Sequence, residues 1–246
     1  MCNNLSLLLF IQFQLYITIL AYPSLRHAIE DLPGDQLLRI EGAIDPNLEI
    51  GEIHRRVFHA GGPALFFEKV KGSPFVALSN LYGTKERTAY LFRHQLEGVQ
   101  RLIQLKADPS DLLRHPGKFL KTPFTAMHGL PLKARWNKPV LSGTTTLDQL
   151  PQVVSWPKDG GAFITLPQVM SLPPGDNSIM NSNIGMYRIQ ISGNEYVPNL
   201  EAGMHYQLHR GIGVHHTLYN QTRDEFKVTI FVGGPPSHAF AAIMPL

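Results

Sequence analysis

Hydrophobic residues recur at helical spacing in the first half of the chain. Leu48, Ile50, Ile53, Val57 and Ala60 follow one another at near-helical spacing, which predicts an amphipathic helix. Asp45-Pro46 precedes this segment as a predicted helix start, and Gly61-Gly62 follows it as a predicted helix end. A second, longer helix is predicted from Thr84, its N-cap residue, to about residue 106.

Two apolar runs between these helices, residues 64–70 and 75–79, are typical of buried strands. Strands that alternate with helices indicate an α/β architecture. We therefore expect an N-terminal α/β domain over residues 22–115.

After Pro109 the pattern changes, because prolines divide the chain into short pieces. Several short strands separated by turns favour a barrel or a sandwich. We place a domain boundary near residues 108–122 and expect a β-rich domain over residues 116–246. The segments that alternate apolar and polar side chains as strands do are 163–170, 186–191, 203–209 and 227–232.

Residues 5–21 fit neither pattern. They are almost continuously apolar, but the run is short for a membrane helix and contains two glutamines. No Lys or Arg precedes Arg26, although a secretory signal needs a positive start. We interpret residues 1–21 as a leader or extension outside the fold, with a membrane anchor as the second interpretation and a signal peptide as the third.

Composition and charge narrow the class of protein. The 246 residues are 43% hydrophobic, which supports a packed core and excludes disordered and fibrous classes. Lys and Arg number 22 against 19 Asp and Glu, and no basic run reaches five residues, so no nucleic-acid partner is expected. The single Cys2 excludes an internal disulfide framework and favours a reducing, cytoplasmic location. No acidic residue follows Glu225.

The first candidate for chemistry is an arginine in segment 182–190. On a strand, Arg188 shares a face with Met186 and Gln190, and the large apolar residues lie on the other face. Such an arginine either binds a phosphate or carboxylate, or lies in water on an edge strand. Spacing alone slightly favours the edge strand.

The second candidate is segment 203–211, in which His205 and His209 lie four residues apart. On a helix this spacing would suggest a zinc-binding face, but the glutamate of that motif is missing and apolar residues alternate with polar ones. The segment therefore predicts a strand whose polar face offers an imidazole to a metal or hydrogen bonds to a flavin. For any single histidine, a surface position remains the better explanation.

The third candidate is Gly233-Gly234, which follows the last predicted strand. A glycine pair there lets the backbone approach a ligand, and the start of a following helix attracts anions. A plain tight turn is the alternative. The sequence contains no P-loop, dinucleotide-binding or nucleophile-elbow motif.

Together these stretches resemble the UbiD family of decarboxylases, which use prenylated FMN and a divalent metal. The resemblance covers the chain from about residue 22 onward, and the order of its parts is more specific than any one part. The matching segments are Leu38-Arg39-Ile40, Asp45-Pro46-Asn47-Leu48-Glu49-Ile50, Ala60-Gly61-Gly62-Pro63-Ala64-Leu65-Phe66-Phe67-Glu68, Asn80-Leu81-Tyr82-Gly83-Thr84, Asp159-Gly160-Gly161-Ala162-Phe163-Ile164-Thr165-Leu166-Pro167, Asn183-Ile184-Gly185-Met186-Tyr187-Arg188, 203–211 and 233–236.

The resemblance implies a fold and a reaction. The second domain is expected to be a split β-barrel related to flavin reductases, incomplete at its C-terminus. The implied reaction removes CO₂ from an aromatic or α,β-unsaturated carboxylic acid, as in ubiquinone and menaquinone biosynthesis. Prenylated FMN acts in the family as the electron sink, and the protein supplies orientation and electrostatics.

The resemblance also implies site residues. Asn183 and His209 match ligands of Mn²⁺ or a similar cation. Arg188 matches the catalytic arginine, which pairs with the catalytic acid and the substrate carboxylate. The residues that match prenylated-FMN contacts are Ile184, Met186, Tyr187, Arg188, His205, Tyr206, Gln207, Arg210 and Gly211.

The sequence departs from the family at its end. The third metal ligand, a glutamate, and the catalytic acids are expected beyond Leu246, together with the C-terminal domain through which family members homo-oligomerise. We therefore expect the N-terminal part of a UbiD-type decarboxylase, inactive by itself and binding prenylated FMN weakly. The alternative is a stand-alone flavin-binding module. Peripheral membrane association is considered but not favoured.

Overall fold

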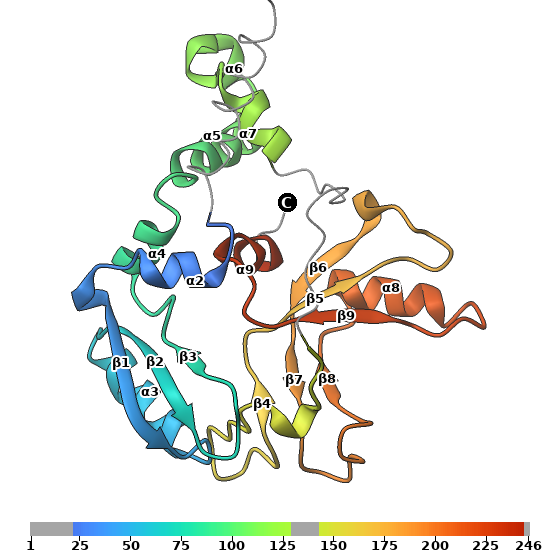
Figure 1. Ribbon diagram of the computed structural model, residues 1–246. Coiled ribbons are helices and arrows are strands. Elements are labelled where there is room, and N and C mark those ends of the chain that lie inside the picture. The colour runs from blue at the N-terminus through green and yellow to red at the C-terminus, as the bar shows by residue number, and fades with distance from the viewer. Residues whose placement is uncertain (1–21, 129–142, 244–246) are drawn as a thin grey trace, which may run out of the picture.

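The first sheet is built around a parallel pair of strands. The computed structural model describes residues 22–128 and 143–243 (Figure 1). β1 (Leu37–Ile44) pairs in parallel with β2 (Ala64–Val70), and β3 (Ala77–Ser79) adds to β2 in the antiparallel direction. α3 (Glu49–His59) connects β1 with β2, as a parallel pair requires a crossover.

Helices cover both faces of this sheet. On one face Leu65 and Phe67 of β2 pack with Ile50 of α3, and all three are buried. On the other face Ala64 packs with Ala28 of α2 (Leu25–Glu30) and Leu91 of α4 (Lys85–Leu91). Neighbouring residues of a strand point to opposite faces, so Ala64 and Leu65 belong to different clusters. The expected α/β architecture is confirmed for this sheet.

The helix predicted after Asp45-Pro46 begins later than expected. α3 starts at Glu49, and the Asp45 carboxylate accepts a hydrogen bond from the Asn47 amide (2.8 Å). Leu48 N donates to Val154 O (2.8 Å), and Val154 N donates to Pro46 O (3.1 Å). The prediction of Asp45 as the helix cap was wrong, because pairing with a distant segment keeps the backbone from turning helical at once.

The long helix predicted from Thr84 consists of two helices. Thr84 caps α4 as predicted, since its hydroxyl accepts a hydrogen bond from the Arg87 amide (3.2 Å). α5 (Leu96–Ala107) begins only after a break. In the break the Phe92 ring lies 6.2 Å from that of Tyr82 and 5.0 Å from that of Phe240. Phe92 therefore packs against the C-terminal helix instead of continuing the helical face.

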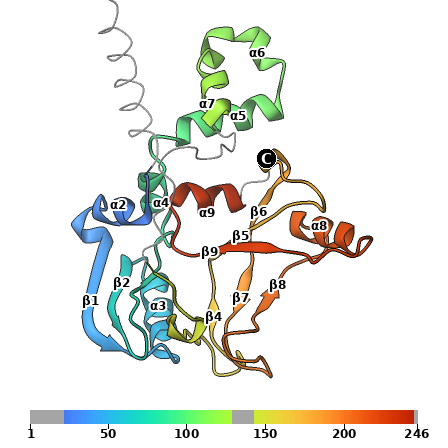
Figure 2. The same ribbon diagram turned by 45° about the vertical axis from the view of Figure 1, so that its right-hand side comes forward.

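The helices α5, α6 (Asp111–Arg114) and α7 (Thr122–His128) form a helical lobe that stands apart from the sheets (Figures 1 and 2). Some polar side chains of this lobe are buried and some apolar ones are exposed. Asp111 and Thr122 are 7% and 6% exposed, whereas Leu113 and Phe124 are 85% and 65% exposed. Phe119, between α6 and α7, is an apolar side chain that is buried, at 2% exposed.

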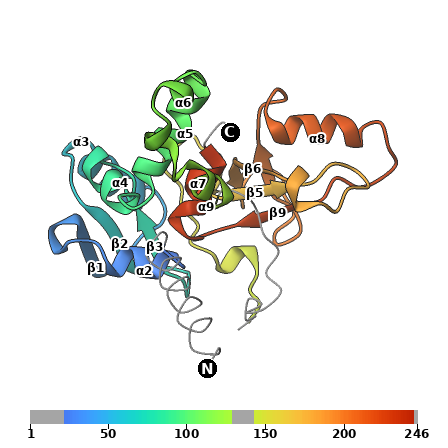
Figure 3. The same cartoon turned by 90° about the horizontal axis from the view of Figure 1, so that it is seen from above.

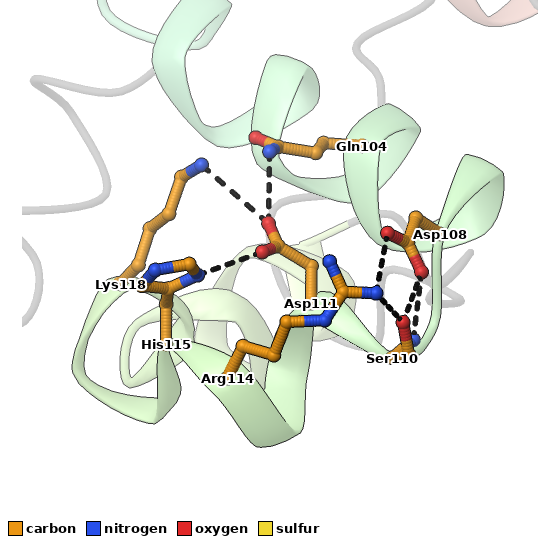
Figure 4. A network of polar contacts seen from close by, with 7 residues as sticks. All are labelled: Gln104, Asp108, Ser110, Asp111, Arg114, His115 and Lys118. Atoms are coloured by element: carbon orange, nitrogen blue, oxygen red, sulfur yellow. Dashed lines mark hydrogen bonds and ion pairs between the residues drawn. The ribbon is translucent and has the colours of Figure 1, made fainter.

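Asp111 connects the parts of the helical lobe (Figure 4). Its carboxylate accepts a hydrogen bond from Gln104 Nε2 (2.8 Å), lies 2.8 Å from His115 Nδ1 and forms an ion pair with Lys118 Nζ (3.7 Å). The hydrogen bond with His115, followed by the charges of Lys118, His115 and Arg114, lowers the pKa of the Asp111 carboxyl. The network also lines an open cavity of about 540 Å³.

The second half of the chain forms two small antiparallel sheets with two helices. α8 (Gly211–Tyr219) packs against β6 (Asn183–Met186), and α9 (Pro236–Ile243) packs against β5 (Gln168–Ser171) and β6. Seen from above, α8 lies on the side of the molecule away from the first sheet (Figure 3). The sheets are β4 (Phe163–Ile164), β7 (Arg188–Gln190) and β8 (Gly203–His205) in the order β4-β7-β8, and β6 (Asn183–Met186), β5 (Gln168–Ser171) and β9 (Val228–Phe231) in the order β6-β5-β9.

Neither of these sheets closes into a barrel within the described residues, so the split barrel is not confirmed. The segment predicted as one strand over 163–170 is divided into β4 and β5, and Pro167 between them has no amide hydrogen for a ladder. The strand predicted over 203–209 ends at His205. Short 3₁₀ turns cover Gly34–Gln36, Pro116–Phe119, Leu147–Gln149 and Ile179–Asn181.

Across residues 22–128 and 143–243, no helix has the length and apolar character needed to span a bilayer. The predictions for residues 1–21 lie outside the described residues.

Arg87 is 1% exposed and makes no ion pair among the residues described; backbone carbonyls surround it instead. Its guanidinium donates to Asn80 O (2.7 Å), Leu81 O (2.9 Å) and Gly62 O (3.1 Å), and to Gln36 Oε1 (3.2 Å). Burial lowers the pKa of this guanidinium. One side chain thus holds together the turn before β2, the turn after β3 and the start of β1.

Replacing Arg87 with Met is expected to lower the free energy of unfolding by about 3 kcal/mol, because several buried acceptors lose their charged donor. Urea denaturation measures this loss. The control is Arg56→Met, whose side chain is 79% exposed and pairs with Glu52; it is expected to cost less than about 1 kcal/mol. Equal losses in the two variants would contradict the role given to Arg87.

The Asp111 network is expected to make stability depend on pH. A carboxyl whose folded-state pKa is lowered stabilises the fold above its unfolded pKa, and this contribution disappears as the pH falls through the folded value. Asp111→Asn should therefore be less stable than the native protein at pH 7, with a difference that shrinks below about pH 4. Thermal unfolding between pH 7 and pH 3 tests this, with the exposed Glu225→Gln as the control.

Candidate functional site

The predicted site is organised around Tyr187, where the chain passes from one small sheet to the other. β6 ends at Met186 and β7 begins at Arg188, yet the two strands belong to different sheets. Tyr187 is 9% exposed and lies in the core cluster of the second half. The continuous strand predicted over 186–191 was wrong, because the ladder is interrupted at Tyr187 and the strands on its two sides pair in different sheets.

Asn183 is oriented by Tyr187. Its Nδ2 donates a hydrogen bond to the Tyr187 hydroxyl (3.4 Å), which leaves Oδ1 to face the start of α8. There Oδ1 lies against Gly211, where a Cβ atom would collide with it. The absence of a side chain at Gly211 is therefore what leaves room for the Asn183 oxygen.

The start of α8 offers backbone donors to a ligand. Its N-cap residue is Arg210, and no side chain caps the first turn. His209 and Arg210 are exposed immediately before the helix. Unpaired amides at a helix start attract anions. The structure thus brings Asn183 beside the segment that carries His209, Arg210 and Gly211.

A second group of predicted residues lies on the sheet β4-β7-β8. Arg188 and His205 are directly opposite each other on β7 and β8, and Arg188 Nη2 donates to His205 Nδ1 (3.3 Å). Because an arginine only donates, Nδ1 accepts and the ring proton lies on Nε2. The guanidinium carbon lies 4.3 Å from the centroid of the Phe163 ring. No sequence signal pointed to this role of Phe163, because its neighbours come from strands far apart in the chain.

Arg188 is an exposed arginine without a carboxylate within ion-pair distance among the described residues, as are Arg26, Arg210 and Arg223. Arg188 is in addition held by its contacts with His205 and Phe163. An ordered guanidinium without an acid is suited to bind a phosphate or carboxylate. The arginines that do pair with a carboxylate include Arg39, Arg55, Arg56, Arg93, Arg101 and Arg114.

The predicted tyrosines belong to an aromatic cluster. The Tyr187 and Tyr206 rings meet edge to face at 6.3 Å, and the Tyr206 hydroxyl is hydrogen-bonded to His216 Nδ1. His216 in turn stacks on Phe226, with centroids 5.5 Å apart. His216 carried no signal in the sequence, yet it fixes Tyr206 between α8 and β8.

The remaining predicted residues lie outside the two groups formed around Asn183 and around Arg188. Ile184 and Met186 are half-buried on β6, and Gln207 is exposed in the turn after β8. Gly233 adopts a φ of 70° in the turn between β9 and α9, so the glycine there serves a tight turn. Beside it Gln168 is 5% exposed, and its Oε1 finds no hydrogen-bond partner among the residues described.

The donor set for a metal is small. No group of three His, Cys, Asp or Glu side chains gathers in the described part of the chain. The Asn183 oxygen, in the space left by Gly211, and the imidazole of His209, two residues before Gly211 in the chain, are donor types that fit a hard or borderline cation. The neighbouring His215 is engaged elsewhere: its Nδ1 lies 2.9 Å from Ser171 Oγ, and burial lowers its pKa.

Comparison with protein families identifies the chain. Residues 133–246 match the 3-octaprenyl-4-hydroxybenzoate carboxy-lyase Rift-related domain, and residues 34–106 match the N-terminal domain of the same carboxy-lyase. The chain therefore belongs to the UbiD family, as the sequence motifs predicted.

Relatives of the chain are longer. An uncharacterized protein of Chlamydia trachomatis is 37% identical over 231 residues, which cover 91% of this chain and 38% of that protein. A Chlamydia pneumoniae protein, named as one subunit of a 4-hydroxybenzoate decarboxylase, is 36% identical over 229 residues, covering 86% of this chain and 35% of that protein. The chain thus spans less than two fifths of the length of these relatives.

Solved structures share the fold. The closed form of vanillic acid decarboxylase from Sedimentibacter hydroxybenzoicus superimposes with a TM-score of 0.69 at 21% identity, over 92% of this chain and 46% of that one. The UbiD-class enzyme HmfF from Pelotomaculum thermopropionicum, in complex with prenylated FMN, gives a TM-score of 0.61 at 19% identity, over 87% and 45% of the two chains.

Proposed function

We propose that this chain is the prenylated-FMN-binding part of a UbiD-type decarboxylase that acts on an aromatic or α,β-unsaturated carboxylic acid. The observation that carries this proposal is the meeting of Asn183 with the uncapped start of α8, next to His209. Membership of the UbiD family and the prenylated FMN in HmfF support the same assignment. We propose that the two small sheets are parts of a split barrel spanning residues 116–246, after an α/β domain over residues 22–115.

The start of α8 is the proposed phosphate end of the site. The free amides of its first turn and the Arg210 guanidinium suit a phosphate dianion. Asn183 Oδ1 and the His209 imidazole would hold Mn²⁺ or a similar cation beside that phosphate. A glutamate from outside the described residues would complete the ligand set.

The sheet β4-β7-β8 is the proposed reaction end. Arg188 would bind the substrate carboxylate with two parallel hydrogen bonds, and His205 would fix the position of the guanidinium. Prenylated FMN, when bound, supplies the electron sink for the charge left by the departing CO₂. The partly buried residues Ile184, Met186 and Tyr206 would form apolar surface against its ring, with Gln207 as a hydrogen-bonding partner.

The proposed reaction also needs a proton donor at this site. General acid catalysis needs a carboxyl within hydrogen-bond reach of the substrate, and Arg188 has no carboxylate partner among the described residues. We therefore propose that the acid and the oligomeric assembly come from a further polypeptide region. The name of the Chlamydia pneumoniae relative, which describes it as one subunit of a decarboxylase, supports an assembly of more than one kind of chain.

Titration of the purified chain with prenylated FMN tests this proposal. We expect weak binding that depends on Mn²⁺, with a Kd of about 0.1 mM, and no CO₂ release from 4-hydroxybenzoate. Asn183→Ala and His209→Ala should each abolish the Mn²⁺ dependence, whereas the exposed His59→Ala should not. Absence of binding would refute the proposal. Micromolar binding without catalysis would favour the stand-alone flavin-binding module instead.

Gly211→Ala is expected to separate binding from folding. The added Cβ displaces Asn183 Oδ1, which is the end of a flexible side chain, so stability should change by less than about 1 kcal/mol. Mn²⁺-dependent binding should weaken at least about tenfold, because the oxygen ligand moves. The control is Gly117→Ala, where a Cβ meets no atom within 4 Å. Unchanged Mn²⁺ dependence in Gly211→Ala would remove Asn183 from the metal site.

A further inference from the structure

Phe163 is the residue on which the proposed reaction end is assembled. It lies opposite Gln190 in the pairing of β4 with β7, so its side chain is a diagonal neighbour of Arg188 on the same face. It is only 6% exposed, although it belongs to a two-residue strand. Two exposed side chains, those of Arg188 and His205, lie against its ring on this face.

The geometry around the ring is specific. The Arg188 guanidinium carbon lies 4.3 Å from the ring centroid, within the range of a cation–π contact. The His205 ring meets the Phe163 ring edge to face, with centroids 5.7 Å apart and planes at 87°. Arg188 and His205 are also hydrogen-bonded to each other. Each of the three side chains therefore restricts the other two.

An aliphatic side chain could fill the same volume but could not make the same contacts. Leu offers neither a negative π face for a cation nor a flat surface for an imidazole edge. Without the ring, the long Arg188 side chain would regain its rotamer freedom, and a ligand would have to order it on binding. No carboxylate among the described residues would replace the contact.

We propose that Phe163 is a positioning residue, which holds the Arg188 guanidinium and the His205 imidazole in place for an anionic ligand. This inference rests on the proposed function for the identity of that ligand, and it concerns a residue that touches the site only through Arg188 and His205. The aromatic ring, and not hydrophobic volume alone, is the required property.

The test follows the Arg188 Nε–Hε resonance in protein labelled with ¹⁵N-arginine, assigned by its loss in Arg188→Lys. A proton over an aromatic face is shifted upfield. We expect this shift in the native protein and in Phe163→Tyr, and its loss with signal averaging in Phe163→Leu. The packing control is Ile189→Val, a change at a residue 2% exposed on the other side of the same sheet; it should leave the Arg188 resonance in place.

Binding of FMN provides the second readout, because Arg188 matches a flavin contact of the family as well as the arginine that binds the substrate carboxylate. Phe163→Leu should weaken binding about fivefold and Phe163→Tyr should stay within about twofold of the native protein. In Arg188→Lys the Phe163→Leu substitution should have little further effect, because the two residues act through one contact.

An Arg188 resonance that is unchanged in Phe163→Leu, or moved equally by Ile189→Val, would overturn the proposal. Loss of the ring-current shift without any change in FMN affinity would overturn it as well. If the native protein binds no flavin, the proposed function fails, while the resonance still decides whether Phe163 holds Arg188.

Discussion

Tyr187, at the junction of the two small sheets, is the constraint on which the candidate site depends. β6 before it and β7 after it pair with different strands, and the buried Tyr187 ring packs against Tyr206 at 6.3 Å. The same tyrosine accepts the hydrogen bond that turns the Asn183 oxygen toward α8. One buried ring therefore sets both ends of the site.

Polar groups outside this site have hydrogen-bond or ion-pair partners within the protein, whereas some polar groups of the site lack such partners among the described residues. Arg87 is buried, and backbone carbonyls and Gln36 accept its guanidinium hydrogen bonds; Asp111 is engaged by Gln104, His115 and Lys118. Such groups hold the fold, since leaving a buried donor or acceptor unpaired costs about 1–3 kcal/mol. At the site, by contrast, the first turn of α8 has no side-chain cap and Arg188 has no carboxylate within the described part of the chain. These groups keep their binding capacity for a ligand.

The sequence correctly predicted those parts of the structure that depend on residues close together in the chain. The strand at β2 and the Thr84 cap were predicted correctly, because strand burial and helix capping depend on neighbouring residues. The start of α3 was misplaced, since Val154 pairs with the backbone before it. The break between α4 and α5 was missed for the same kind of reason, as Phe92 packs against Phe240. Contacts between segments that are far apart in the chain produce no periodic pattern in the sequence.

The site residues were found through motif order, whereas their geometry was not predictable from spacing. Asn183-x-Gly185-x-Tyr187-Arg188 now has a physical explanation. Gly185 must lack a side chain because the Tyr187 hydroxyl lies against it. Tyr187 orients Asn183, and Arg188 lies on the sheet that carries Phe163. Gly211 supplies the matching space on α8. Each residue depends on a neighbour's position, so their effects on binding are coupled and do not add independently.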